Sequence, residues 1–280
     1  MRVLTWMVAL TALAAPVGAN AQSCEEAGSR SRGDALDVVA LGGRLYDKWW
    51  ATCGLAEPNT THPSYPSTVG KQAGATTARC KECHGWDYRG KDGAYSKGSH
   101  FTGIAGIAGY AGRAEADILV ILKDETHQYG KVLNDEALKA ISKFVSKGQV
   151  DAGAAIDSKT KKVRGNVALG QRIFERQCIA CHGAKGRAMN FSGNAAEPEY
   201  MGTLAADNPW EMLHKIRNGH PNAVMDDARM QARYNDPDAS GRSRMGLHMI
   251  EGRAMPAYRE SLSWSEQLNL LSFLQTLPAR

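Results

Sequence analysis

Three features are scarce in this chain of 280 residues. After residue 21, no apolar run approaches the ~20 residues that a membrane-spanning helix requires, so we expect no retained membrane span. Lys and Arg (34) only slightly outnumber Asp and Glu (29) and are spread along the chain, so we expect no nucleic-acid partner. Aromatic residues make up 7% of the chain, which is little for the two cores that this length predicts.

The first 21 residues have the pattern of a cleavable signal peptide. Arg2 gives a basic start, residues 3–17 form an apolar stretch, and residues 19–21 (Ala-Asn-Ala) form a small-x-small cleavage site. The stretch is too short and too rich in alanine to be kept as an anchor. We therefore expect a mature chain that begins at Gln22 and is exported to a bacterial periplasm.

The sequence Cys-x-x-Cys-His occurs twice, at residues 80–84 and 178–182. This spacing is the attachment signature of a c-type haem, in which two thiols bind the porphyrin and the His binds the iron. A zinc-type or redox Cys-x-x-Cys pair is the alternative, and two copies in an exported chain make it the weaker interpretation. We expect two covalently bound haem c groups, attached through Cys80, Cys83, Cys178 and Cys181, with His84 and His182 as proximal iron ligands.

The surroundings of the two motifs repeat. Residues 40–46 (ALGGRLY) and 168–174 (ALGQRIF) both read as part of an amphipathic helix, with a Gly four residues before an aromatic. In the second copy the motif follows at once. In the first copy about thirty extra residues intervene, including a Pro- and Thr-rich loop at 57–69.

Each copy continues with a Gly-rich stretch and then two helices. The first of these helices is expected at 114–123 in one copy and at 209–217 in the other. A terminal helix that opens with a capping residue follows at 134–145 and at 263–277. Their apolar stripes are Leu138, Ile141 and Val145 in one copy, and Leu268, Leu271 and Leu274 in the other.

This arrangement resembles the class I cytochrome c domain, used twice, from about residue 34 to the end. The resemblance implies an all-α fold in which the first helix crosses the last, the haem motif follows the first helix, and the sixth iron ligand precedes the last. Each haem would add a large apolar body to a core with few aromatics. The expected organisation is a signal peptide at 1–21, domain 1 at 22–150, a linker at 151–165 and domain 2 at 166–280.

The sixth ligand of the second iron is expected in the loop before the last helix. A Met there raises the reduction potential, whereas a second His lowers it. Met255, followed by a Pro, occupies the position that the family gives to its distal Met. Met225 is the alternative, but an Asp follows it and it lies farther from the helix. Three other candidates fall in an insertion at 222–253 and are interpreted as surface or packing residues: Met245, His248 and Met249.

The first domain has no methionine to offer its iron, because none lies between Met7 and Met189. His127 is the predicted sixth ligand, since it matches Met255 in its short loop, its following Tyr and its distance from the last helix. The alternatives that stay open are His100, in the Gly-rich loop after the motif, and then His62, Cys24 and Cys53.

Two cysteines, Cys24 and Cys53, remain outside the haem motifs. In an oxidising compartment such a pair most often forms a disulfide, which we expect here. The alternative is a Cys53 thiolate bound to the first haem, since thiosulfate dehydrogenases and related dihaem cytochromes of sulfur oxidation use a Cys ligand. In those families the Cys follows the haem motif, whereas Cys53 precedes it.

These features together predict an electron carrier. We expect a periplasmic dihaem cytochrome c that transfers single electrons between redox partner proteins, with the lower potential at the first haem. The alternative is a dihaem oxidoreductase acting on a small inorganic sulfur substrate such as thiosulfate. A dihaem peroxidase is disfavoured because it requires an open distal position. A subunit docked to a larger oxidoreductase also stays open.

Overall fold

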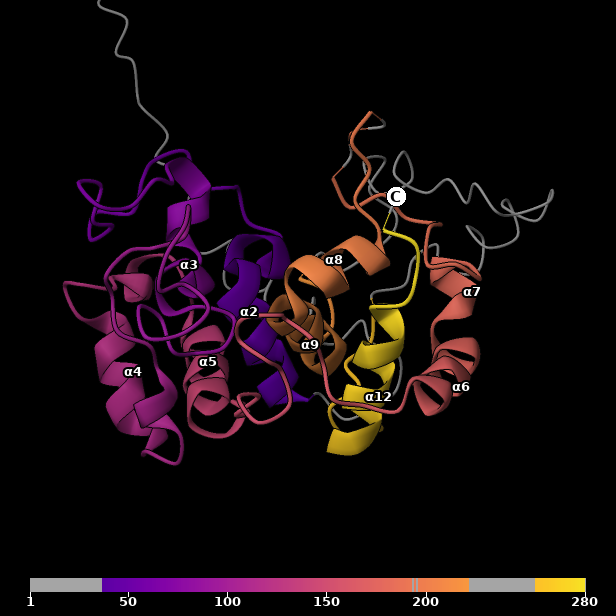
Figure 1. Cartoon of the computed structure of the whole chain (residues 1–280). Coiled ribbons are helices and arrows are strands. Elements are labelled where there is room, and N and C mark those ends of the chain that lie inside the picture. The colour runs from indigo at the N-terminus through magenta and orange to yellow at the C-terminus, as the bar shows by residue number, and fades with distance from the viewer. Residues whose placement is uncertain (1–36, 193, 195, 222–254, 280) are drawn as a thin grey trace, which may run out of the picture.

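The computed structural model describes residues 37–192, 194, 196–221 and 255–279. This part of the chain is helical and contains no β-strand; isolated bridges join Gly90 to Ala105 and Ile156 to Val163 (Figure 1). The expected all-α fold is therefore confirmed. No helix within these ranges is long and apolar enough to cross a membrane. Several residues named above lie outside the described ones: the expected signal peptide 1–21, Gln22, Cys24, Met225, Met245, His248 and Met249.

The first half of the molecule, residues 37–150, has a first and a last helix that pack against one another. Its α-helices and 3-10 helices (η) are α2 (Val38–Cys53), η2 (Gly74–Ala78), α3 (Cys80–His84), η3 (Ala108–Tyr110), α4 (Glu115–Lys123), η4 (Tyr129–Lys131) and α5 (Asp135–Lys147). Asp37 opens α2 by accepting hydrogen bonds from the backbone N–H groups of Val39 and Ala40. Asn134 opens α5 in the same way, as its capping pattern predicts.

The second half, residues 166–279, repeats this arrangement, with α6 packed on α12 as α2 is packed on α5 (Figure 1). Its elements are α6 (Val167–Gln177), α7 (Ile179–His182), α8 (Met201–Asp207), α9 (Pro209–Asn218) and α12 (Trp264–Leu274). Ser263 and Glu266 form a reciprocal capping box at the start of α12. This helix ends at Leu274, short of the predicted Leu277, because Pro278 disfavours helical conformation in the residue before it.

A glycine lies where the helices of each pair cross. A Cβ atom on Gly42 would overlap the backbone of Ala140, and one on Gly170 would overlap the backbone of Asn269. Glycine lets the two backbones approach closely at these points. The repeat seen in the sequence therefore has a packing reason, and it is the same reason in both halves.

Each half has a hydrophobic core, and the second core includes residues from the first half. The aromatic of each repeat, Tyr46 or Phe174, is 1% exposed. Trp86 and Tyr95 from the first half, and Ile156 from the expected linker, belong to the second core. The halves are thus packed together rather than joined by a free tether. The predicted apolar stripes are buried: Leu138, Ile141, Val145, Leu268, Leu271 and Leu274.

A buried charged cluster also joins the halves. The Asp47 carboxylate on α2 is 1% exposed; it pairs with Arg79, just before the first motif, and with Lys215 on α9 at 2.7 Å. Burial alone would raise the pKa of Asp47, but Lys215 and Arg79 hold it well below its ordinary value. Beside them, the buried His214 ring accepts a hydrogen bond from the Tyr88 hydroxyl (3.0 Å) and donates one to a backbone carbonyl of α2 (2.8 Å).

Candidate functional site

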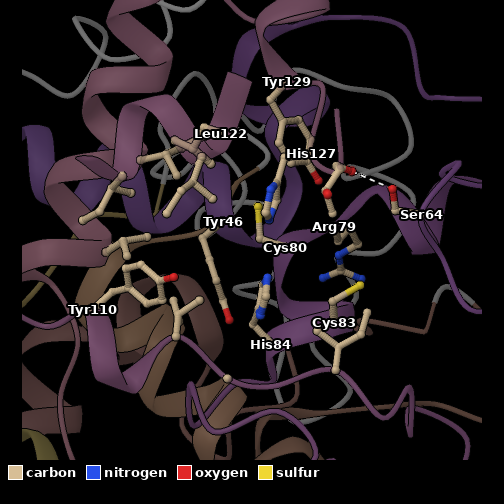
Figure 2. A pocket seen from close by; sticks show the side chains of 18 of the residues that line it. Tyr46, Ser64, Arg79, Cys80, Cys83, His84, Tyr110, Leu122, His127 and Tyr129 are labelled. Carbon is tan, nitrogen blue, oxygen red and sulfur yellow. Dashed lines mark hydrogen bonds between the residues drawn. The ribbon is translucent and has the colours of Figure 1, made fainter. Parts of the chain in front are cut away.

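The first Cys-x-x-Cys-His motif forms α3, a short helix that lines a cavity (Figure 2). The helix ends at Gly85, whose φ of 78° lies in the region that favours glycine. Burial raises the pKa of Cys80 to about 11 and that of Cys83 to about 12, so both free thiols stay protonated at neutral pH. His84 lines the same cavity. All three side chains of the attachment signature therefore face one space.

The cavity has a volume of about 290 Å³. Three tyrosines line it: Tyr46, Tyr110 and Tyr129. Two of their hydroxyls are bonded to backbone carbonyls that flank the motif, that of Tyr46 to Gly85 (2.6 Å) and that of Tyr129 to Ala78 (3.0 Å). Because these polar groups are satisfied by the protein, the space suits a large and mostly apolar group. Helices α4 and α5 contribute an aliphatic lining: Ile118, Ile121, Leu122, Ile141 and Val145.

Two imidazoles face one another across this cavity. The ring centroids of His84 and His127 lie 6.3 Å apart with their planes inclined by 21°, and Figure 2 shows the rings pointing toward each other. A bond from a metal to an imidazole nitrogen is about 2 Å long, so two imidazoles on one metal hold their coordinating nitrogens about 4 Å apart. The centroid separation leaves a gap of this size once the radius of each ring is subtracted.

Each imidazole is oriented by a hydrogen bond from its other nitrogen. His84 Nδ1 donates to the carbonyl of Ala105 (2.8 Å), and His127 Nδ1 donates to the carboxylate of Asp124 (3.1 Å). Each Nε2 then carries a lone pair, which is the form that binds a metal. Burial lowers the pKa of His84, which keeps its ring neutral. The pair therefore fits an iron held between the two Nε2 atoms.

The other histidines considered for the first iron are engaged elsewhere. His100 does not line the cavity, and its Nδ1 lies 3.0 Å from both carboxylate oxygens of Glu82. His62 does line the cavity, but both of its nitrogens are used. Its Nε2 donates to the carbonyl of His127 (3.1 Å) and its Nδ1 accepts the backbone N–H of Ser64 (3.3 Å). Neither ring offers a lone pair to the cavity.

Cys53 is not available as a thiolate ligand. It is fully buried and disulfide-bonded. This agrees with the expected disulfide, whose other member, Cys24, lies outside the described residues. The alternative in which Cys53 binds the first iron is therefore wrong for this structure, because a sulfur in a disulfide carries no thiolate charge.

The second motif follows α6 directly: Cys178 is the N-cap residue of α7, and the other four residues of the motif form this helix. Cys178 and Cys181 are not joined in a disulfide, and burial raises the pKa of Cys178 to about 12. Burial also lowers the pKa of His182 to about 4, so its ring is neutral at pH 7. The Nδ1 atom of His182 is buried without a hydrogen-bond partner among the described residues. A neutral imidazole and two thiols again meet the chemistry of haem attachment.

The segment that contains Met255 runs beside the second motif. The backbone of Met255 lies against Gly219 at the end of α9. The backbone N–H of Tyr258 donates to Ile216 (2.9 Å), and the Tyr258 hydroxyl donates to the carbonyl of Gln177 (3.2 Å), just before the motif. The contact between this segment and the residue just before the motif is thus made by Tyr258 and not by Met255.

Several residues that shape the first site were not predicted. Ala105 acts through a backbone carbonyl, which leaves no side-chain signal in a sequence. Asp124 accepts the backbone N–H of His127 (2.8 Å) as well as its ring N–H. An Asp three residues before a candidate ligand is a turn-forming pattern that could have indicated this role. The contacts of His62 and Ser64 with the same loop carry no comparable signal.

Comparison with known proteins finds a c-type cytochrome family that matches part of the chain. Residues 165–240 match the family model described as cytochrome C oxidase, cbb3-type, subunit III. No curated protein and no solved structure matches the chain. The matched segment contains the second Cys-x-x-Cys-His motif and is similar to a cytochrome c domain. This similarity implies covalently bound haem c and electron transfer with redox partners.

Proposed function

We propose that this protein is an exported dihaem c-type cytochrome that carries single electrons between redox partner proteins. The facing imidazoles of His84 and His127, beside two free thiols, are the observation that carries the proposal. The family match at 165–240 supports the same chemistry in the second half. The glycine crossing found in both helix pairs supports two tandem cytochrome c domains, at 22–150 and 166–280.

At the first motif, Cys80 and Cys83 would attach the haem, with His84 and His127 as the axial ligands. When bound, a haem supplies a one-electron iron couple. The hydrogen bonds of the two imidazoles hold each ring in the tautomer whose Nε2 faces the cavity. Because protein donors would fill both axial positions, no position is left for a small substrate, which favours electron transfer over catalysis.

At the second motif, Cys178 and Cys181 would attach the haem and His182 would bind from the proximal side. Met255 is the proposed sixth ligand, supported by its place in the segment that Tyr258 ties to the flank of the motif. A thioether at this iron and two imidazoles at the other favour the higher potential in the second half. Electrons would therefore flow from the first half to the second.

A redox titration of the haem-loaded protein tests the first ligand set. Replacing His127 by Met should raise the lower of two potentials and leave the higher one nearly unchanged, because a thioether stabilises ferrous iron relative to an imidazole. His100→Ala is the matched control, since its ring is bonded to Glu82 outside the cavity. A His127→Ala protein whose first haem stays low-spin at the same potential would refute the assignment.

Near-infrared absorption of the ferric protein tests the second ligand set. A Met–iron bond gives a weak charge-transfer band, which Met255→Ala should abolish and Met225→Ala should leave. The opposite result would move the ligand to Met225. Mass spectrometry of the exported protein should show two haem masses added to a chain that begins at Gln22. A chain without haem would end the proposal.

A further inference from the structure

Two side chains from the extra segment of the first half hold the loop that presents His127. This segment, residues 54–73 between α2 and η2, has no counterpart in the second half, where α7 follows α6 directly. The imidazole of His62 donates to the carbonyl of His127 (3.1 Å), and the hydroxyl of Ser64 donates to the carbonyl of Thr126 (2.7 Å). We call His62 and Ser64 the clamp and residues 124–129 the distal loop.

The clamp is itself fixed in one arrangement. The backbone N–H of Ser64 donates to Nδ1 of His62, which leaves the proton on Nε2, where it is donated to the distal loop. The backbone N–H of His62 is bonded to the Thr77 hydroxyl (2.8 Å), and this hydroxyl donates to the carbonyl of Gly74. These bonds tie the clamp to η2, which leads directly into the first motif.

The distal loop needs such support because its backbone is strained next to the ligand. Gln128, directly after His127, has a φ of 55°, in the left-handed region that a residue with a Cβ adopts only at a cost. Within the loop, Asp124 accepts the backbone N–H groups of Thr126 and His127. The bonds to Asp124 satisfy only the backbone N–H groups of the loop. The carbonyls of Thr126 and His127 are satisfied from outside, by the clamp.

We propose that His62 and Ser64 are positioning residues that keep His127 in place as an axial ligand and so close the first iron to exogenous ligands. This inference rests on the proposed function. Without the clamp, the distal loop would relax toward unstrained backbone and swing the imidazole of His127 away from that of His84. The first haem would then acquire a part-time open position.

Carbon monoxide binding to the reduced, haem-loaded full chain tests the clamp. The variants are His62→Ala, Ser64→Ala and the double variant. His62→Gln keeps an N–H donor, so it should restore much of the wild-type behaviour. Gln72→Ala is the matched control, because Gln72 lies in the same segment but donates to the carbonyl of Ser99, away from the distal loop.

We expect carbon monoxide binding at the first haem to tighten by about ten- to thirtyfold in the double variant and by less in each single variant. The low-spin signal of the ferric first haem should weaken in parallel, while the second haem and the Gln72→Ala control stay unchanged. Ser64→Ala removes only one hydroxyl from an exposed site, so it keeps the test available if a His62 variant folds poorly.

Two negative results are distinguishable. A wild-type protein with a bis-imidazole spectrum at the first haem, whose carbon monoxide binding is the same in all variants, would overturn the clamp and leave the proposed function intact. A wild-type protein without a bis-imidazole spectrum would overturn both.

Discussion

The two halves present the same motif with different support around it. His84 and His182 stand at equivalent positions, at the ends of α3 and α7. His84 Nδ1 donates to a backbone carbonyl at 2.8 Å, whereas His182 Nδ1 is buried without a partner among the described residues. In metal sites such a second hydrogen bond fixes the tautomer and raises the basicity of the ligand. The first half thus orients the imidazole of its motif through a hydrogen bond within the protein.

The segments that lie across from the two motifs also differ. In the first half a second imidazole is oriented by Asp124, and an extra segment holds its loop. In the second half the segment around Met255 is tied to the motif through Tyr258. The same pair of crossing helices therefore supports two different surroundings of the motif. What differs is the chain inserted between the shared elements.

The largest expected effect is the selective loss of one haem when the cysteines of one motif are replaced. Replacing Cys178 and Cys181 by Ala should remove the covalently attached second haem and leave the first in place. The mass of the protein should fall by one haem, measured after denaturation so that non-covalent haem is lost. The Cys80→Ala, Cys83→Ala protein is the matched variant, with the opposite haem retained. Loss of both haems from either variant would show that the halves do not load independently.

Breaking the buried cluster between the halves should have the next largest effect. Asp47→Asn removes the carboxylate that Arg79 and Lys215 share, and Lys215 keeps only its longer contact with Glu211 (3.4 Å). The free energy of unfolding at pH 7 should therefore fall by about 3 kcal/mol. Denaturant unfolding measures it. Glu136→Gln, which breaks an exposed pair with Lys139, is the control and should change stability little.

The pH dependence of this cluster has a definite sign. The pKa of Asp47 is lower in the folded state than in the unfolded chain, where it is about 3.9. Its contribution to stability is therefore present above about pH 4 and is lost as the pH falls further. The stability difference between wild type and Asp47→Asn should shrink below that pH. A difference that stays constant between pH 7 and pH 3 would contradict the charged pairing.

Replacing the glycine at each helix crossing should test whether the two helix pairs are packed equally tightly. Gly42→Ala and Gly170→Ala each place a Cβ against the backbone of the partner helix, so each should lower stability by about 1–3 kcal/mol. Helix propensity alone would predict a gain from either change. Gly109→Ala is the control, because a Cβ there meets nothing within 4 Å. The midpoint of thermal unfolding measures both effects. A loss of stability in only one of the two variants would show that the two crossings are not packed alike.

The smallest expected effect concerns the second half. Tyr258→Phe removes the hydrogen bond to the carbonyl of Gln177 and should cost about 1 kcal/mol or less. The near-infrared band assigned to Met255 should weaken slightly if this bond helps to hold the segment. Tyr110→Phe is the control, because Tyr110 lines the cavity of the first half and should leave the spectrum of the second half unchanged. Equal spectra in all three proteins would mean that other residues position Met255.

Most of the architecture could be predicted because it depends on local patterns. The capping residues Asn134 and Ser263 open the helices they were expected to open, and the glycine of each repeat marks a real crossing. Hydrophobic spacing and capping act within a few residues, so a sequence records them directly. The apolar pattern places the end of α12 at Leu277, three residues beyond its true end, because that pattern does not include the effect of Pro278 on the residues before it.

Thiol spacing and helical periodicity are properties of residues close together in the chain, so both the haem-attachment signature and the helix pairs can be recognised without the fold. The sequence also pointed to His127 and left His100, His62 and Cys53 open. The neighbours of each of these side chains depend on the three-dimensional fold. His127 lies opposite His84, His100 is bonded to Glu82, His62 spends both nitrogens on backbone groups, and Cys53 is in a disulfide. A lone pair is available to a metal only where no neighbour has taken it, and neighbours distant in sequence are set by the fold.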